Sequence, residues 1–167
     1  MITKTSLLAT RALLFLTADK SELPVSPRSI ALQLGESQAY MAKVLRALVK
    51  SGILRAAHGS RGGVLLNRNA REITLLAIVE ACQGTIVGSY CQDIANLAVT
   101  CAFHQATVEL QHSIVNVLAR WTLEHLAASP HPPRRLPGGM HCLLAGGPVS
   151  RDGGKSRRRN TSAKGDD

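Results

Sequence analysis

Residues 24–54, PVSPRSIALQLGESQAYMAKVLRALVKSGIL, decide the fold of this chain. Ser26 is a natural helix N-cap, and Pro27 suits the first helical position because its missing N–H needs no partner there. The segment PRSIALQL is therefore expected to form a helix. Gly35 ends that helix, since glycine tolerates the left-handed conformation common after a helix C-terminus.

A second helix is expected directly after this turn. Ser37 can cap it, and Gly52 closes it. Its apolar residues recur at helical spacing and predict one buried face, formed by Met41, Val44, Leu45, Leu48 and Val49. Two short helices separated by a glycine turn predict a helix–turn–helix, whose second helix is the one that enters DNA.

The next stretch, LRAAHGSRGGVLLNR over residues 54–68, is predicted to be a β-hairpin with a flexible, cationic tip. A hairpin directly after a helix–turn–helix is typical of a winged helix. Its glycines, among them Gly62, let the backbone approach a phosphate closely, and a cation at the tip can enter a minor groove. His58 and Arg61 are the candidate tip residues. Taken alone, the segment is equally an ordinary glycine turn with one solvated arginine.

Residues outside the apolar face of the second helix are the candidates for reading DNA. Gln38 can pair with adenine, Ser37 can contact a phosphate or a base, and Lys43 can reach guanine or a phosphate. Tyr40 has two interpretations, a bond to a phosphate oxygen or packing at the edge of the helix. Arg28, in the first turn of the preceding helix, is a candidate phosphate clamp.

The 167 residues carry a formal net charge of +9, which favours a polyanionic partner such as nucleic acid. Much of that charge lies in residues 129–167, which hold eight Lys/Arg and three Asp in a Pro-, Gly- and Ser-rich sequence that predicts disorder. Arg46 and Lys50 are interpreted as a solvated helix face. Aromatic residues are only 3%, which argues against a stacking platform for single strands. The sequence lacks the common catalytic motifs, so an enzyme is not expected.

Apolar residues at helical spacing, including Leu8, Ala12 and Phe15, predict a first helix over residues 3–18. Arg11 interrupts the apolar run and no convincing cleavage site follows, so this segment is interpreted as part of the mature protein rather than as a signal peptide. No apolar run reaches the roughly 18 residues of a membrane span. We therefore expect a cytoplasmic protein without membrane contact, in which the four cysteines form no structural disulfides.

A long helix is expected over residues 104–127, HQATVELQHSIVNVLARWTLEHLA. Its apolar side chains step by four, three and four residues, the spacing of a coiled-coil seam, at Leu110, Ile114, Val117 and Trp121. Such a helix needs a partner for this face, and a symmetric second copy is the economical one. The alternative is that the helix folds back on its own domain.

Four segments together, ATRALLFL, the helix–turn–helix stretch, HGSRGGVLL and REITLLAIVEACQG, resemble the Rrf-two family of winged-helix repressors. That family includes the iron–sulfur cluster regulator and the nitric-oxide sensor, and the resemblance covers residues 3–127. It implies homodimers on partly palindromic operators, with the third helix in the major groove and the wing at the minor groove. Three positions depart from the family, one of them the wing tyrosine, which aligns with Val64. The family's wing arginine aligns with His58, so Arg61 would have to supply the charge, and its polar reader aligns with Ala42.

The resemblance also implies a cofactor site. Some members hold an iron–sulfur cluster in a loop before the long helix, with three cysteines and, in the cluster regulator, a histidine three residues after the last one. Cys91, Cys101 and His104 match the first cysteine, the last cysteine and the histidine, whereas the middle cysteine is missing. The implied [2Fe–2S] cluster would need a further ligand from Cys82 or from the partner subunit's first helix. The alternatives are a reversible Cys91–Cys101 disulfide that senses oxidants, a zinc site, or no sensing chemistry.

The expected fold is mainly α-helical with a small β-hairpin. Its expected parts are a winged helix–turn–helix domain over 1–83, a sensor loop over 84–103, a dimerisation helix over 104–128 and a disordered basic tail over 129–167. The expected function is a homodimeric, sequence-specific transcriptional repressor that binds double-stranded DNA and responds to redox state or to an iron–sulfur cluster. The alternatives are a winged-helix protein-interaction module and a thiol-switch regulator without a cluster.

Overall fold

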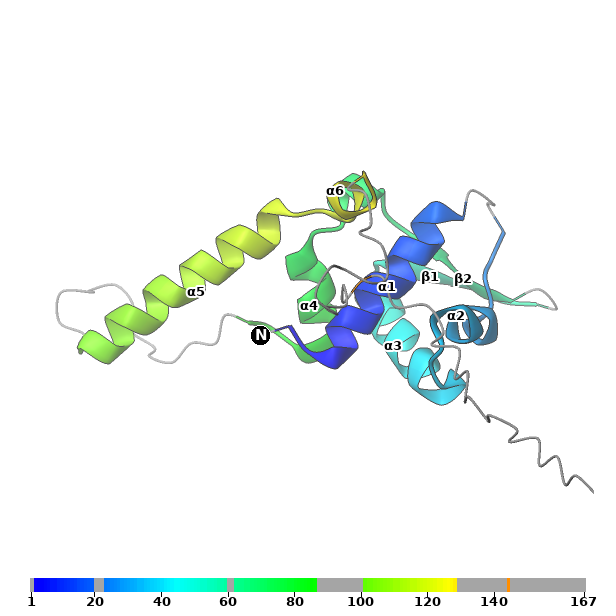
Figure 1. The fold of residues 1–167 in the computed structure, drawn as a ribbon, viewed down its shortest axis with the longest axis horizontal. Helices are drawn as coiled ribbons and strands as arrows, with labels where there is room; N and C mark the ends of the chain where they lie inside the picture. The colour runs from blue at the N-terminus through cyan, green and yellow to red at the C-terminus, as the bar shows by residue number, and fades with distance from the viewer. Residues whose placement is uncertain (1, 20–22, 60–61, 87–100, 129–143, 145–167) are drawn as a thin grey trace, which may run out of the picture.

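A computed structural model describes residues 2–19, 23–59, 62–86, 101–128 and residue 144. The protein is mainly helical with one two-stranded antiparallel hairpin, which confirms the predicted fold class (Figure 1). Its elements in chain order are α1 (Lys4–Ala18), α2 (Pro27–Leu34), α3 (Gln38–Lys50), β1 (Leu54–Ala57), β2 (Gly63–Leu66), η1 (Ala70–Glu72), α4 (Leu75–Gln83), α5 (Ala102–Arg120) and α6 (Leu123–Ala128). The predictions for Arg61, for Cys91 and, apart from residue 144, for the basic tail fall outside the described residues.

The helix–turn–helix forms with the caps that the sequence predicts. The Ser26 side chain accepts a hydrogen bond from the backbone N–H of Ser29 at the start of α2. Gly35 ends that helix in the left-handed conformation, with φ of 69°. The Ser37 side chain then accepts from the backbone N–H of Tyr40 and caps α3. These caps satisfy donors that a helix start otherwise leaves unpaired, so both helix boundaries are set locally.

Helix α1 lies at the centre of the molecule and contacts α2, α3, α4, α6 and β2 (Figure 1). Its Ala9, Ala12 and Leu13 are fully buried. They belong to one hydrophobic cluster that also takes in Met41 and Leu48 from α3. A single core therefore holds α3, the hairpin and the C-terminal helix α6 around α1. Among the described residues, no helix is both long enough and apolar enough to cross a membrane.

The wing is a two-stranded sheet, and one residue from before α2 pairs with its strand β2. Strand β1 pairs with β2 so that Leu54 lies opposite Leu66. Val25, just before α2, forms an antiparallel bridge to Val64, in which each backbone N–H donates to the other residue's carbonyl oxygen, with N···O distances of 3.1 and 2.9 Å. Gly63 allows this close approach, because a Cβ atom there would lie 2.5 Å from the carbonyl oxygen of Val25.

The single long helix predicted over residues 104–127 is wrong in one respect, since the chain forms two helices there. Trp121 ends α5 in an extended conformation, with φ of −88° and ψ of 124°. Its carbonyl oxygen accepts from the N–H of Leu75, and Leu123 donates to the carbonyl of Ile73, both at 2.8 Å. This non-local bridge between Thr74 and Thr122 replaces helical hydrogen bonds and starts α6 in a new direction. Helix α5 then projects away from the winged domain (Figure 1).

Candidate nucleic-acid interface and sensor residues

Helix α3 presents a row of cations on the face opposite the core. Lys43, Arg46 and Lys50 are exposed at steps of three and four residues, in line with exposed Ala39. The other face buries Met41, Val44, Leu45 and Leu48. None of the three cations forms an ion pair with another residue of the described ranges. Uncompensated cations in a row are the arrangement that attracts the phosphates of a nucleic acid.

Arg46 and Lys50 were interpreted from the sequence as a solvated face. They remain exposed, but they continue the line that begins with Lys43. The helical steps between these three positions were readable from the sequence. Sequence reasoning passed over the two residues because a charge run on a helix is usually a solvated surface.

The polar residues predicted to read DNA gather around the helix–turn–helix. Gln38 is exposed in the first turn of α3, directly after its N-cap Ser37. The Ser37 hydroxyl is engaged in capping, at 3.3 Å from the Tyr40 nitrogen. Arg28 is exposed in the first turn of α2. The side chains of Gln38 and Arg28 are therefore open to a ligand, whereas that of Ser37 already supports the helix start.

Tyr40 differs from these neighbours because its hydroxyl is occupied. The Oη atom lies 3.0 Å from Oγ1 of Thr5 on α1, and the ring packs against the hydrophobic cluster. Of the two interpretations of Tyr40, this geometry favours packing at the helix edge. The bond joins the first turn of α1 to the first turn of the recognition helix.

The described part of the wing tip is a glycine turn with an exposed histidine. Gly59 has φ of 109°, a conformation that strains any residue with a side chain. Gly62 donates its N–H to the Gly59 carbonyl at 3.0 Å and closes the turn. His58 is exposed beside it. The tip thus presents His58 to solvent, whereas the prediction for Arg61 concerns a residue outside the described ranges.

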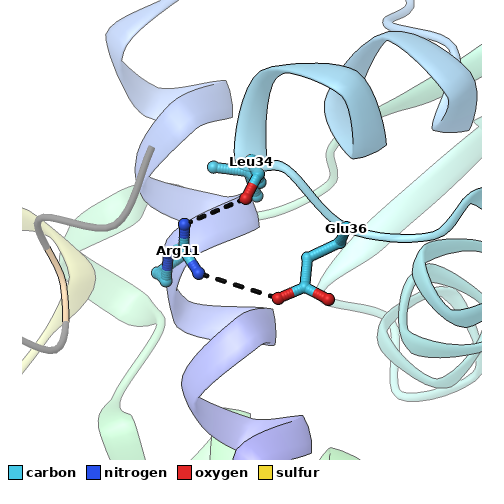
Figure 2. Close-up of polar contacts among 3 residues, drawn as sticks. All are labelled: Arg11, Leu34 and Glu36. Atoms are coloured by element: carbon cyan, nitrogen blue, oxygen red, sulfur yellow. Dashed lines mark hydrogen bonds and ion pairs between the residues drawn. The ribbon is translucent and has the colours of Figure 1, made fainter. Parts of the chain in front are cut away.

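Arg11 on α1 contacts the turn between α2 and α3 (Figure 2). Its Nη2 atom donates to the carbonyl oxygen of Leu34 at 3.2 Å, and its Nη1 atom lies 3.9 Å from Oε1 of Glu36. Sequence reasoning noted Arg11 only as an interruption of an apolar helix. That interruption was the available signal, because a cation inside an apolar run needs a partner when the helix is buried.

The candidate cluster ligands divide between described and undescribed residues. Cys101 is the exposed N-cap residue of α5, and His104 follows one turn later. His104 is only 5% exposed, and its Nε2 atom has no hydrogen-bond partner among the described residues. Buried polar atoms are nearly always paired, so the described residues by themselves leave this imidazole nitrogen incompletely satisfied. Cys91, the third candidate, lies outside the described residues.

Cys82, considered as a further ligand, lies in a different environment. It is half-buried on α4, and its Sγ atom lies 4.0 Å from the carbonyl oxygen of Thr5. Burial raises the pKa of the Cys82 thiol. The described ranges contain no group of three His, Cys, Asp or Glu residues that could hold a metal ion. The structure therefore does not bring Cys82 together with Cys101 and His104.

Helix α5 carries an apolar row that its own domain leaves open. Leu110, Val117 and Trp121 are exposed, and Ile114 is half-buried between them. Phe103, which is 80% exposed, continues the row one heptad before Leu110. Sequence reasoning missed Phe103, although the step of seven was readable. A groove of about 600 Å³ borders this row and is lined by Ile2, Ile86, Ser113, Ile114, Val117 and Leu118.

Comparisons with known proteins agree with this architecture. The Rrf2 family profile, described as "Iron-dependent Transcriptional regulator", matches residues 2–129. The chain is 28% identical over 129 residues to protein aau3 of Rhizobium meliloti, spanning 75% of this chain and 83% of that protein. It is also 28% identical over 120 residues to the HTH-type transcriptional regulator IscR of Pectobacterium atrosepticum, spanning 71% of this chain and 73% of IscR.

Solved structures show the same fold. CymR, the global cysteine regulator of B. subtilis, superposes with a TM-score of 0.63 at 23% identity, covering 78% of this chain and 98% of CymR. IscR of T. potens superposes with a TM-score of 0.59 at 24% identity, covering 79% of this chain and 93% of IscR. CymR and the IscR of Pectobacterium atrosepticum are both named as regulators. Because the family profile spans most of the chain, the protein belongs to the Rrf2 family of helix–turn–helix transcriptional regulators.

Proposed function

We propose that this protein is a homodimeric repressor that binds a partly palindromic DNA duplex and responds to a [2Fe–2S] cluster. One observation carries the DNA-binding part, the uncompensated row of Lys43, Arg46 and Lys50 on α3. The row begins beside the exposed amide of Gln38, so one helix face offers both phosphate and base contacts.

In the proposed complex, α3 lies in the major groove and the wing lies over the adjacent minor groove. Gln38 pairs with a base edge, while Lys43, Arg46 and Arg28 contact phosphates on either side. His58 and Arg61 supply the contacts of the wing, where the narrow minor groove concentrates negative potential. Ala42 offers no polar contact, so the preferred duplex differs from that of family members with a polar reader at this position.

The dimer forms through α5 in this proposal. Phe103, Leu110, Ile114, Val117 and Trp121 follow one seam along the helix, and their exposure leaves apolar area that a second copy can cover. The neighbouring groove has room for side chains of the partner's helix. Two copies related by a two-fold axis would place their α3 helices in successive major grooves, about 34 Å apart.

Cys101 and His104 fit a cluster site as far as the described residues extend. One is an exposed thiol and the other a buried imidazole with an unpaired nitrogen, one helical turn apart. In the proposed site these two residues, Cys91 and a further ligand from the partner subunit's first helix would hold the cluster, which would supply a redox-active centre when bound. Mixed thiolate and imidazole ligation raises the reduction potential relative to four thiolates. Because Cys101 and His104 lie at the N-terminus of α5 and the proposed dimer seam runs along the same helix, a change at that end can alter the spacing of the two α3 helices.

Anaerobic purification tests the cluster. We expect visible absorption bands of a [2Fe–2S] centre, with iron and sulfide in equal amounts, which are lost in Cys101→Ser and His104→Ala. Cys82→Ser serves as the matched control and should keep the bands. A colourless, iron-free protein that still binds DNA would contradict the cluster and leave the thiol-switch alternative.

Selection from a random duplex pool tests the DNA-binding part. We expect the full-length protein to enrich a partly palindromic duplex, with affinity that falls steeply as salt increases. If no sequence is enriched and binding to DNA is absent at low salt, the protein-interaction alternative replaces the repressor.

A further inference from the structure

We propose that Arg11 is a positioning residue for DNA recognition, because it holds the helix–turn–helix turn in place from α1 through two different nitrogen atoms. This inference rests on the proposed DNA-binding function. Figure 2 shows the arrangement, in which the guanidinium of Arg11 faces both the end of α2 and the turn that leads to α3. No DNA contact is assigned to Arg11 itself.

The first contact is with the end of α2. Leu34 is the last residue of that helix, and its carbonyl oxygen accepts from Nη2 of Arg11 at 3.2 Å. The final carbonyls of a helix have no partner within the helix, and they carry partial negative charge. Neighbouring backbone bonds, from Gly35 to Leu32 and from Glu36 to Ala31, already close the turn. The bond from Arg11 comes from outside the turn, and it connects the turn to α1.

The second contact is with the turn itself. Oε1 of Glu36 lies 3.9 Å from Nη1 of Arg11, and Glu36 directly precedes Ser37, the N-cap of α3. The guanidinium fork thus spans the end of one helix and the start of the next. Lysine has a single nitrogen and cannot reproduce this fork, because its ammonium is a point charge on a flexible stem.

Stability alone does not account for an arginine at this position. The Arg11 side chain is 12% exposed, and its Nε atom is buried without a hydrogen-bond partner among the described residues. Apolar side chains at both positions 11 and 36 would avoid burying that nitrogen, and an ion pair replaced as a whole by apolar residues often costs no stability. The two contacts of the Arg11 guanidinium are therefore better explained by their effect on structure, since they hold the α2–α3 turn in one position relative to α1.

The consequence concerns specificity. A recognition helix must hold its base-reading side chains within a narrow range of orientations, whereas phosphate contacts tolerate more variation. Loosening the turn should therefore reduce affinity for the preferred duplex more than affinity for unrelated DNA. The measured quantity is the ratio of the two dissociation constants.

The test uses the full-length protein and the duplex enriched from a random pool, with a scrambled duplex of equal length for comparison. We expect Arg11→Met to reduce the ratio about tenfold, the effect of losing roughly one charged hydrogen bond. Arg11→Lys should keep the charge and still lose several-fold in the ratio. Arg71→Met is the control, since it removes a cation from η1, beside α6, and should leave the ratio unchanged. Circular dichroism and melting temperature verify that each variant is folded.

A double variant separates positioning from charge masking. If Arg11 only neutralises Glu36, then Arg11→Met/Glu36→Gln should regain the wild-type ratio, and this result would overturn the proposal. We expect no recovery, because the contact with the Leu34 carbonyl is still missing. A full wild-type ratio in Arg11→Lys would also overturn it. A wild-type protein without preference for any duplex would overturn the proposed function and this inference together.

Discussion

The hydroxyl oxygen of Tyr40 lies 3.0 Å from Oγ1 of Thr5, so the first turn of the recognition helix is hydrogen-bonded to the first turn of α1. Together with the contacts of Arg11, this bond gives α1 two polar links to the helix–turn–helix. Both links come from a helix that also packs on α4 and α6. Helix α1 therefore contacts α3 as well as α4 and α6, and α4 in turn contacts α5.

Replacing Tyr40 by phenylalanine removes the bond to Thr5 and keeps the packing of the ring. We expect a loss of about 0.5–1.5 kcal/mol in the free energy of unfolding, the usual contribution of one hydrogen bond. Chemical denaturation measures it. Thr5→Val should cost a similar amount, and the double variant should cost little more. Weaker DNA binding by Tyr40→Phe, with an unchanged salt slope and unchanged stability, would instead support a hydrogen bond from the neutral hydroxyl to a phosphate oxygen.

Removing a cation from the row on α3 should weaken DNA binding through lost counterion release. We expect Lys43→Ala and Arg46→Ala each to reduce the slope of log affinity against log salt by about 0.9, the contribution of one phosphate contact. Fluorescence anisotropy at several salt concentrations measures this slope. The control is Arg71→Met, which should leave it unchanged. An unaltered slope in Arg46→Ala would restore the interpretation of Arg46 as a solvated residue.

A charge in the apolar row of α5 should separate the proposed dimer. Leu110 is 61% exposed, so Leu110→Asp should leave the fold intact while it places an uncompensated charge in the seam. Analytical ultracentrifugation should then detect a monomer. Ala119→Asp, exposed on the opposite side of α5, is the matched control and should remain a dimer. A Leu110→Asp protein that sediments as a dimer would remove this face from the interface.

A methyl group at Gly63 should displace the edge of the wing. The new Cβ atom would lie 2.5 Å from the Val25 carbonyl oxygen, so the bridge between Val25 and Val64 has to open. We expect a loss of about 1–3 kcal/mol in the free energy of unfolding, as for overpacking elsewhere. Denaturation curves should show no comparable loss for Ala56→Ser, which changes an exposed residue of β1. Equal stability of Gly63→Ala would mean that the close approach is not required.

The two described cysteines should differ in reactivity. Burial raises the pKa of Cys82 above its ordinary value of 9.0, so less of the reactive thiolate is present at pH 8. In protein freed of metal by chelation, we expect iodoacetamide to modify the exposed Cys101 faster than Cys82. The rate at Cys82 should rise only at more alkaline pH. Peptide mass spectrometry measures both sites, and Cys82→Ser identifies the slow signal. Equal rates at pH 8 would contradict the buried position of Cys82.

The elements that could be predicted from the amino-acid sequence are those whose signals are local. Ser26, Gly35 and Ser37 act on the residues beside them, through caps and a left-handed turn, so the boundaries of α2 and α3 follow without knowledge of the core. The hairpin position and the buried face of α3 follow in the same way, from glycines and from helical periodicity.

Features that depend on partners distant in the chain could not be predicted from the sequence and are set by the packed fold. The break between α5 and α6 at Trp121 results from hydrogen bonds to residues 73–75. The helical periodicity of residues 104–127 does not indicate these bonds. The occupied hydroxyl of Tyr40 and the two contacts of Arg11 are likewise set by how α1 packs on the helix–turn–helix. Hydrogen bonds between such segments depend on the relative placement of whole helices, which the packing of one shared core determines.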